Sequence, residues 1–372
     1  MASVIDDNHF MRLALALARQ SRPSPNPRVG AVIVQQNRIV GKGFHRAPGQ
    51  PHAEIEALKD ATDAGENVCN ATIYVTLEPC CHQGRTGPCS VALHQSGIGR
   101  IVVGMADPDP LVGGNGIASL RRSGHQVDVG VLEDECKQLL HTYIHHRTHG
   151  RPLVHLKAAT TLDGYLATAT GDSKWITSSK ARAVGHQLRA SHDGILIGSG
   201  TVLADNPTLT VRDADGKTPT RVILDSHLRI PLESNLLKTS SEGKVIVLHS
   251  ADVSLHQANI LSNIPNVQLI ECKQKNDMLD IDDVIQKLND LGFLSVLVEG
   301  GSKLHGAFIQ AKLADQLSLF IAPKIIGSGI PWASIPGVAN IVEAIQLKTD
   351  TIHTTQLDMD TLIEGDFLWD EG

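Results

Sequence analysis

Three potential metal ligands, His52, Cys80 and Cys89, place the strongest constraint on how this chain can fold. His52 follows Pro51 at the start of a segment with helical apolar spacing, and Pro79 ends a β-branched stretch just before Cys80. If the three side chains bind one ion, a helix start, a strand end and the loop after that strand must lie together. Histidine with two thiolates is a standard zinc ligand set, and a catalytic zinc keeps its fourth position for water. The sequence therefore predicts a catalytic zinc site.

The first 150 residues predict an α/β layer around that site. Asp6 or Asp7 can cap a helix that runs to about Gln20, because a carboxylate there accepts N–H groups of the first turn. Pro51 can begin the next helix, which puts His52 and Glu54 in its first turn. Strands are expected at 29–34, 38–44, 72–77 and 100–105, a short helix from residue 89, a further helix and strand up to residue 131, and a polar helix from about residue 133.

The length of 372 residues is roughly twice the usual domain size and favours two domains. We place the boundary near Gly150, which gives domains 1–150 and 151–372. The second domain is expected to be α/β as well. Its predicted strands are 153–159, 194–198, 221–225, 244–249, 267–272, 294–298 and 315–326, its predicted helices are 178–190 and 281–291, and residues 356–368 are expected to form an edge pair.

The distribution of charge argues against a nucleic-acid partner. The first 150 residues carry 14 basic and 14 acidic side chains, leaving 19 and 26 for the rest. Affinity for nucleic acid comes mainly from Lys and Arg that neutralise phosphates, and neither half offers such a surface. The acidic start is unlike a signal peptide, and no apolar run approaches the ~18 residues of a membrane span. The sequence therefore predicts a cytoplasmic protein without a nucleic-acid or membrane partner.

Glu54 adds a chemical function to the predicted zinc site. Zinc lowers the pKa of bound water from ~15.7 to ~7, which makes water a nucleophile at neutral pH. Attack on an amino-bearing ring carbon also needs a group that takes the water proton and passes it to the departing ammonia, and Glu54 is placed for this role. His-x-Glu followed by Pro-Cys resembles the zinc-dependent nucleobase deaminases, whose signature continues Cys-x-x-Cys. Here eight residues separate Cys80 from Cys89.

Other interpretations of these residues stay open. Cys81 could replace Cys89 as a ligand, although adjacent cysteine side chains diverge, and a purely structural zinc would leave Glu54 without a role. The histidines between 141 and 149 could form a second metal site, but they lack a nearby carboxylate or cysteine pattern and are interpreted as a solvated linker. The rival functions are a deaminase of nucleic-acid bases and a zinc-stabilised binding module. Cys69, Cys136 and Cys272 are expected to be ordinary thiols, since a chain without a secretory signal rarely builds a disulfide framework.

Two segments of the first half resemble the bifunctional riboflavin-biosynthesis deaminase/reductase family. They are Thr-Leu-Glu-Pro-Cys-Cys-His-Gln-Gly-Arg-Thr-Gly-Pro-Cys at 76–89 and Pro-Asn-Pro-Arg-Val-Gly-Ala-Val-Ile-Val at 25–34. That family uses the longer cysteine spacing, and by this likeness Asn26, His82 and Arg85 would contact the deaminase substrate. Cys81 stands where serine is usual and Gly87 where proline is usual. These departures leave the zinc ligands and the glutamate in place.

The second half lacks the strand-linked Gly-x-Gly-x-x-Gly of a Rossmann dinucleotide site. Two shorter glycine loops, at 197–201 and 298–302, each end a strand and can open a helix, so that free N–H groups face an anion. Taken alone, either loop could be a structural turn. The segments 157–164, 173–177, 201–212 and 299–301 resemble the reductase domain of the same family. The resemblance implies a dihydrofolate-reductase-like fold that uses NADPH as the hydride source.

Carried over residue by residue, the resemblance implies a reductase site. The cofactor would contact Ala159, Trp175, Thr201, Asp205, Gly300 and Gly301, and the substrate would contact Lys157, Ser173, Arg189, Leu209, Arg212 and Glu299. Arg189 and Arg212 can bind a phosphate bidentately, although Arg189 could be a solvated helix charge and Trp175 a core residue. The implied enzyme is a homo-oligomer with Zn²⁺ and NADPH. It would deaminate a small pyrimidine ribonucleotide, 2,5-diamino-6-ribosylamino-4(3H)-pyrimidinone 5′-phosphate, and then reduce its ribosyl chain to ribityl.

Overall fold

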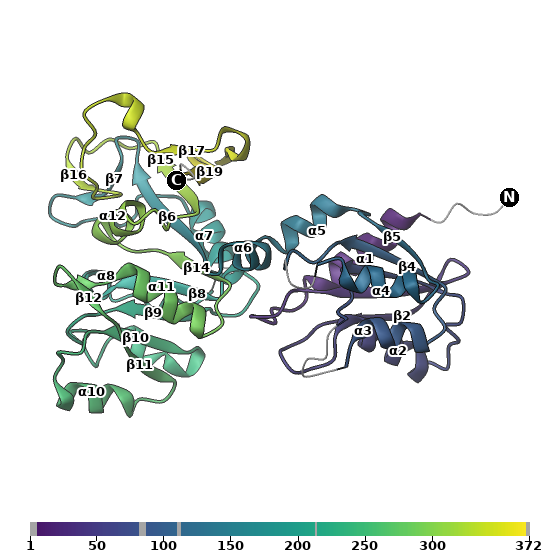
Figure 1. Ribbon diagram of the computed structural model, residues 1–372. Coiled ribbons are helices and arrows are strands. Elements are labelled where there is room, and N and C mark those ends of the chain that lie inside the picture. Colours follow the sequence, from purple (N-terminus) through teal and green to yellow (C-terminus); the bar gives the residue numbers. More distant parts are fainter. Residues whose placement is uncertain (1–5, 82–86, 110–112, 213, 370–372) are drawn as a thin grey trace. The chain divides into compact units, whose positions relative to one another are not determined.

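The computed structural model describes residues 6–81, 87–109, 113–212 and 214–369. The chain divides into two compact units, Met1–Gly150 and Arg151–Gly372, each with its own sheet (Figure 1). Both units combine sheets with helices, so the expected α/β class is confirmed. Within the described ranges, no helix is both long and apolar enough to cross a membrane.

The first unit is built on a five-stranded sheet in the order β2-β1-β3-β4-β5. Its strands are β1 (Gly30–Gln35), β2 (Arg38–Phe44), β3 (Thr72–Leu77), β4 (Arg100–Met105) and β5 (Gln126–Val129). Its helices are α1 (Asp7–Ala18), α2 (Ala53–Asp63), α3 (Cys89–Gln95), α4 (Asn115–Arg122), α5 (Glu133–Leu139) and α6 (His141–His149). β1 pairs antiparallel with β2 and β3, whereas β3, β4 and β5 run parallel. The segments that follow β3 and β4 therefore leave the sheet at the same edge.

Glycines let helices approach both faces of this sheet closely. A Cβ added to Gly30 would lie 2.0 Å from the Ala14 carbonyl oxygen of α1, and one added to Gly43 would lie 2.5 Å from the Ala53 carbonyl oxygen of α2. Gly43 pairs with Ala31, the neighbour of Gly30, so the two helices cover opposite faces (Figure 1). The first turn of α2 is thereby held tightly against β2.

Most predicted elements of the first unit are confirmed. Asp6 caps α1, because its carboxylate accepts the His9 N–H at 3.1 Å. Two predictions were wrong in detail. α2 begins at Ala53 and His52 is its N-cap, with extended backbone at φ −73° and ψ 165°. The polar helix from residue 133 is two helices, α5 and α6, which break at Leu140 with φ −100° and ψ 10°.

The second unit contains a ten-stranded sheet with the path β11-β10-β9-β8-β14-β6-β15-β19-β17, and β18 also pairs with β19. Its strands are β6 (Leu153–Thr161), β8 (Gly194–Gly198), β9 (Thr220–Leu224), β10 (Val245–His249), β11 (Val267–Glu271), β14 (Ser295–Val298), β15 (Gln316–Ala322), β17 (Gln346–Leu347), β18 (His353–Leu357) and β19 (Asp360–Leu368). Separate short pairs are β7 (Tyr165–Thr168) with β16 (Gly329–Pro331), and β12 (Gln274–Lys275) with β13 (Met278–Leu279). The helices are α7 (Ser179–Ser191), α8 (Ser199–Asp205), α9 (Asn235–Lys238), α10 (Leu255–Ser262), α11 (Ile281–Asp290) and α12 (Ser302–Gln310), with 3₁₀ turns at Ser240–Glu242, Ile341–Glu343 and Thr349–Thr351.

The middle strands of the parallel part of this sheet, β10, β9, β8 and β14, are buried on both faces. Ile195 and Ile197 of β8 belong to one apolar cluster, and Leu196 between them belongs to another. Val222 and Ile223 of β9 divide in the same way. Because successive side chains of a strand point to opposite faces, helices must cover both sides, which explains the nearly continuous apolar runs in the sequence.

One strand prediction in the second unit needs correction, and the edge pair is confirmed. The strand expected at 315–326 ends at Ala322, because Pro323 follows and has no N–H for a ladder. The edge pair expected at 356–368 is confirmed, because β18 and β19 pair antiparallel at this end of the sheet, although β18 begins earlier, at His353. On its other side β19 pairs with β15, which joins the pair to the sheet. The connecting helix α11 is confirmed, and Gly292 follows it with a left-handed φ of 81°.

Candidate functional site

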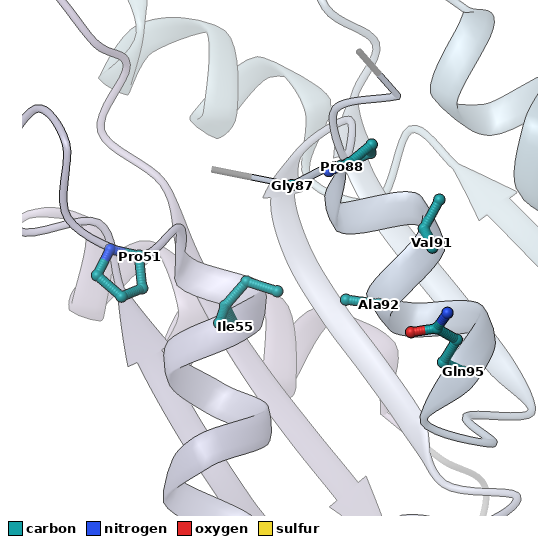
Figure 2. Close-up of a pocket in the computed structure, with 7 residues that line it drawn as sticks. All are labelled: Pro51, Ile55, Gly87, Pro88, Val91, Ala92 and Gln95. Atoms are coloured by element: carbon teal, nitrogen blue, oxygen red, sulfur yellow. The ribbon is translucent and has the colours of Figure 1, made fainter. Parts of the chain in front are cut away.

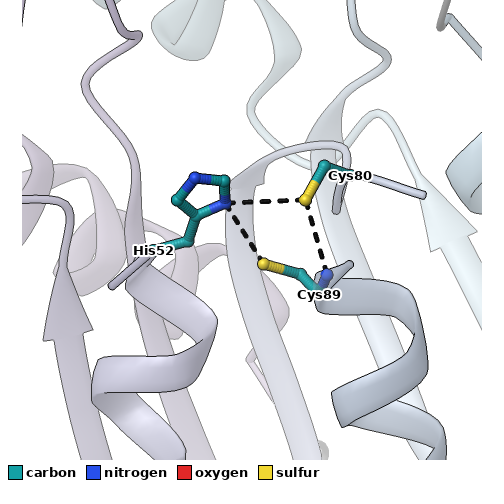
Figure 3. Close-up of side chains that lie close together, drawn as sticks. All are labelled: His52, Cys80 and Cys89. Atoms are coloured by element: carbon teal, nitrogen blue, oxygen red, sulfur yellow. Dashed lines mark hydrogen bonds between the residues drawn. The ribbon is translucent and has the colours of Figure 1, made fainter. Parts of the chain in front are cut away.

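His52, Cys80 and Cys89 converge in the first unit from three elements (Figure 3). His52 caps α2, Cys80 follows β3, and Cys89 is the first residue of α3. The His52 Nδ1 atom lies 3.5 Å from Cys80 Sγ and 3.3 Å from Cys89 Sγ. Among the described residues this is the one group of three or more histidine, cysteine or acidic side chains that could hold a metal ion, and Cys81 does not belong to it.

The geometry of the three ligand atoms fits zinc. A tetrahedral zinc, with Zn–S near ~2.3 Å and Zn–N near ~2.0 Å, places nitrogen and sulfur ligands about 3.6 Å apart and two sulfurs about 3.8 Å apart. The two nitrogen–sulfur distances are close to this value, and all three ligand atoms lie within 4.8 Å of one another. Three protein ligands leave the fourth tetrahedral position for water.

The two thiols also share a hydrogen bond that prepares one of them as a thiolate. A hydrogen bond from Cys89, with a further one from His52, lowers the pKa of Cys80 to about 4 against the opposing effect of burial. The same interaction, together with burial, raises the pKa of Cys89. The Cys89 backbone N–H adds a donor to Cys80 Sγ at 3.4 Å. Such a site binds a cation most readily once both sulfurs have lost their protons.

Glu54 lies in the first turn of α2, two residues after His52, and is 3 % exposed. Burial raises the pKa of its carboxyl to about 7, and the negative charge of Cys80 adds to this effect. A carboxyl with a pKa near the working pH can both accept and release a proton, as general acid–base catalysis requires. The predicted shuttle is therefore held beside the ligands with a suitable pKa.

Asn26 approaches the metal ligands through a histidine that the sequence analysis did not single out. His45 is 2 % exposed, its Nε2 accepts from Asn26 Nδ2 at 2.9 Å, and its Nδ1 donates to the Pro51 carbonyl at 3.0 Å. Its ring lies 5.1 Å from that of His52. Its position seven residues before His52, directly after β2, was the available signal. The other two predicted contacts of the deaminase substrate, His82 and Arg85, lie outside the described residues.

A shallow pocket of about 290 Å³ lies between α2 and α3 (Figure 2). It is lined by Pro51 and Ile55 on one side and by Gly87, Pro88, Val91, Ala92 and Gln95 on the other. None of these side chains can ionise, so they offer no group for proton transfer. The pocket lies at the surface of α2, whose N-cap is His52, and of α3, which begins at Cys89.

The histidines of α6 do not form a second metal site among the described residues, because no further set of three potential ligands converges there. The rings of His145 and His149 stack at 4.2 Å. None of the six cysteines forms a disulfide, and Cys136 and Cys272 are buried while Cys69 is exposed. The prediction of ordinary thiols at these three positions is confirmed.

In the second unit the structure brings Lys157, Arg189 and Glu299 together. Arg189 donates from Nε and Nη2 to the two Glu299 oxygens at 2.7 and 2.6 Å, and Lys157 Nζ lies 3.8 Å from Glu299 Oε2. Lys157 comes from β6, Arg189 from α7, and Glu299 follows β14. The Arg189 side chain is 16 % exposed, so the alternative of a solvated helix charge is wrong. The guanidinium Nε and Nη2 atoms of Arg189 already donate to Glu299, so they are not open to a phosphate.

The charges of this cluster keep Glu299 ionised. Burial alone would raise the pKa of Glu299, but the positive charges of Arg189 and Lys157 outweigh it and lower the pKa to about 2. Burial lowers the pKa of Lys157. His186, one turn before Arg189 on α7, also favours the carboxylate, and its Nδ1 accepts the Arg212 backbone N–H at 3.5 Å. No motif pointed to His186 in the sequence.

The two glycine loops lie at the carboxyl ends of neighbouring parallel strands, β8 and β14. Thr201 lies in the first turn of α8, and a Cβ added to Gly301 would lie 4.0 Å from Thr201 Oγ1. Gly300 has no room for a side chain, since a Cβ there would lie 2.4 Å from Leu304. The loops therefore form one edge with little side-chain bulk, a geometry that suits the phosphates of a dinucleotide.

The remaining predicted reductase residues are more scattered. Trp175 is 65 % exposed, and the Arg182 guanidinium carbon lies over its ring, 4.5 Å from the ring centroid. The interpretation of Trp175 as a core residue is therefore wrong. The Leu209 side chain packs in an apolar cluster and is 4 % exposed. Ala159 lies on β6 two residues after Lys157, and Arg212 is exposed. Among the described residues, no hydrogen bond or ion pair joins Ser173, Trp175, Asp205 or Leu209 to the Glu299 cluster.

Family comparisons identify both units. Residues 4–105 match the family model of the cytidine and deoxycytidylate deaminase zinc-binding region, and residues 152–363 match that of the RibD C-terminal domain. Riboflavin biosynthesis protein RibD of Aquifex aeolicus (strain VF5) is 40 % identical over 95 % of this chain and 97 % of the relative. The chain belongs to the bifunctional riboflavin-biosynthesis deaminase/reductase family. The RibD of Escherichia coli (strain K12) is 37 % identical over 94 % of this chain and 96 % of the relative.

Solved structures agree with this membership. A diaminohydroxyphosphoribosylaminopyrimidine deaminase/5-amino-6-(5-phosphoribosylamino)uracil reductase from Thermotoga maritima superposes with a TM-score of 0.84 at 36 % identity, covering 97 % of this chain and 99 % of that one. Acinetobacter baumannii RibD in its form 2 gives a TM-score of 0.83 at 33 % identity, with 97 % and 99 % coverage. The protein is thus a zinc-dependent deaminase and a reductase of the NADPH-using type, and the expected two-domain architecture is confirmed.

Proposed function

We propose that residues 1–150 deaminate 2,5-diamino-6-ribosylamino-4(3H)-pyrimidinone 5′-phosphate and that residues 151–372 reduce the ribosyl chain of the product to ribityl. The observation that carries this proposal is the convergence of His52, Cys80 and Cys89 beside the buried Glu54. The substrate class is supported by the Thermotoga maritima relative, whose name gives both pyrimidine nucleotides. The protein's small-molecule partner is therefore a pyrimidine ribonucleotide.

In the first domain, His52 Nδ1 and the sulfurs of Cys80 and Cys89 would hold zinc. When bound, zinc lowers the pKa of coordinated water to ~7 and so supplies the nucleophile. Glu54 would take a proton from the attacking water and pass it to the amino group, which leaves as ammonia, while the water oxygen stays on the ring carbon as a carbonyl and the second water proton goes to the neighbouring ring nitrogen. Burial raises the pKa of this carboxyl, which helps it to take up the proton. Asn26, His82 and Arg85 would hold the nucleotide.

In the second domain, NADPH supplies the hydride and the chain's own residues orient it and the substrate. We propose that the cofactor lies against Ala159, Trp175, Thr201, Asp205, Gly300 and Gly301. We propose that the substrate contacts Lys157, Ser173, Arg189, Leu209, Arg212 and Glu299. Because the Arg189 Nε and Nη2 atoms are paired with Glu299, Arg189 would meet the substrate together with that carboxylate, and the exposed Arg212 would bind the phosphate.

The surroundings of the enzyme also belong to this proposal. We infer a cytoplasmic homo-oligomer without nucleic-acid or membrane partners. A second copy could cover exposed apolar side chains near residue 341, where Ile341 and Val342 are 89 % and 82 % exposed. Light scattering after size exclusion measures the oligomeric state, and a monomer at micromolar concentration would contradict this part.

A single assay tests the two activities together. Purified protein is given the diamino nucleotide and NADPH, and absorbance of NADPH and release of ammonia are followed with and without a zinc chelator. We expect ammonia release followed by NADPH oxidation, and the chelator should abolish both with this substrate. With the deaminated nucleotide, NADPH oxidation should survive the chelator. Oxidation of NADPH without ammonia release from the diamino nucleotide would contradict the proposed order of reactions.

A further inference from the structure

We propose that Glu78 is a positioning residue for the metal centre, fixing the segment that carries Cys80 to the loop after β4. Glu78 lies between Leu77, the last residue of β3, and the Pro79-Cys80 pair. It is 6 % exposed. A buried carboxylate needs partners for its charge, and among the described residues no cationic side chain forms an ion pair with it. Its partners are backbone groups.

Four backbone N–H groups donate to the Glu78 carboxylate. Oε2 accepts from Asp107 at 3.0 Å and from Gly114 at 2.8 Å, while Oε1 accepts from Gly116 at 2.8 Å and from Ile117 at 3.1 Å. Three of these donors belong to the start of α4, whose first N–H groups have no partner within the helix. Hydrogen bonds to an ionised acceptor are roughly twice as strong as neutral ones. One side chain therefore joins the end of β3 to two points of the β4–α4 connection.

The contact is so close that movement of α4 would move the Cys80 segment. A Cβ added to Gly116 would lie 2.0 Å from the Pro79 carbonyl oxygen and 3.1 Å from Glu78 Oε1. Pro79 directly precedes Cys80. On its other side Cys80 is tied to α3, because its carbonyl accepts the Ser90 N–H at 3.1 Å. The ligand is thus held between α3 and α4, and Glu78 supplies the hydrogen bonds on the α4 side.

The Glu78→Gln variant tests whether the negative charge of Glu78 and its two acceptor oxygens are needed. Glutamine has one acceptor oxygen, and its NH₂ group would face two of the four N–H donors, so those donors would lose their partner and the loop would shift. Groups that orient metal ligands typically change metal affinity 10- to 100-fold when replaced. The inference rests on the proposed zinc role of His52, Cys80 and Cys89, and its readout is zinc affinity rather than activity.

Asp7 offers a matched control in the same unit. Its carboxylate accepts two N–H groups of Arg100 at 2.8 Å and the Tyr74 hydroxyl at 2.8 Å, and it lies on α1, away from the Cys80 segment. Asp7→Asn therefore removes a comparable set of charge-assisted bonds. The zinc dissociation constant of the full chain is measured by competition with a chromophoric chelator, and the melting temperature is measured in parallel. NADPH oxidation with the deaminated nucleotide checks that the second unit is intact.

We expect both variants to melt earlier than the wild type, but the zinc dissociation constant to rise about 10- to 100-fold only in Glu78→Gln. Gly116→Ala leaves Glu78 intact but forces a methyl group against the Pro79 carbonyl, so this variant should also raise the zinc dissociation constant. If Glu78→Gln does not fold, Gly116→Ala takes its place in the test. Unchanged zinc affinity in Glu78→Gln or, in its place, Gly116→Ala would overturn the inference. If Asp7→Asn lost as much zinc affinity as Glu78→Gln, the inference would also be overturned, because the loss of zinc affinity would then follow from the lower stability of the folded protein. A wild-type protein that binds no zinc would contradict the proposed function itself.

Discussion

Glu54 and Glu299 are both buried, but the two units shift their pKa values in opposite directions. In the first unit, Glu54 lies beside a thiolate and burial raises its pKa to about 7. In the second, Arg189 and Lys157 overcome burial and lower the pKa of Glu299 to about 2. A neighbouring negative charge and desolvation both disfavour a carboxylate, whereas nearby cations favour it. One residue type is thereby suited to moving a proton in one site and to holding a fixed charge in the other.

The largest expected effect is on deamination by Glu54→Gln. Glutamine keeps the size of the side chain but cannot accept the water proton, so kcat for ammonia release should fall about 10²- to 10⁴-fold. Zinc content and the reductase rate should stay unchanged. Glu56→Gln, two residues later on α2, serves as the control and should deaminate normally. Normal ammonia release by Glu54→Gln would remove Glu54 from the mechanism.

Glu299→Gln should damage the other unit. Removing the carboxylate leaves Arg189 and Lys157, whose side chains are only 16 % and 19 % exposed, without their counter-charge, which costs up to about 3–5 kcal/mol of folding stability. All three tryptophans, Trp175, Trp332 and Trp369, lie in the second unit, so their fluorescence during urea unfolding reports on it. Glu271→Gln at the exposed end of β11 should change little. Equal unfolding curves for the wild type and Glu299→Gln would show that the ion cluster contributes no stability.

The third prediction concerns pH. The pKa of Glu299 is lower in the folded protein than its usual 4.5, so its contribution to stability is complete above about pH 4.5 and is lost as the pH falls towards about 2. The shift corresponds to at most about 3 kcal/mol. Tryptophan fluorescence in urea at pH 6, 4 and 3 should show a steeper loss of stability in the wild type than in Glu299→Gln. If stability fell with pH in the same way in the two proteins, the lowered pKa could not be assigned to Glu299.

The zinc centre could be predicted largely from local sequence. His52 and Glu54 lie two residues apart and Cys80 and Cys89 share one loop, so a short motif contains most of the site. The structure added partners that come from distant segments. Glu78 meets N–H groups 29 to 39 residues later in the chain, and His45 meets Asn26. Local patterns do not contain such pairings, because they depend on how the strands are ordered in the sheet.

The second unit shows the same limit more strongly. Arg189 and Glu299 are 110 residues apart, and nothing near either residue in the sequence indicates that their charges pair. Apolar runs predicted most strands, since strands buried on both faces are nearly continuous in hydrophobicity. Strand order was not accessible, so the edge pair of β18 and β19 was predicted without its neighbour β15. The break at Leu140 was also missed, because the polar pattern continues through it.

The division of labour between the two units is tested most directly by the rate of NADPH oxidation in Glu54→Gln with each of the two nucleotides. With the deaminated nucleotide the variant should oxidise NADPH at the wild-type rate, because its second unit is unchanged. With the diamino nucleotide it should oxidise almost none, because that unit receives no product from the first. The account of two separate sites that act in sequence would be contradicted if Glu54→Gln oxidised NADPH at the wild-type rate with the diamino nucleotide. It would also be contradicted if the variant lost NADPH oxidation with both nucleotides.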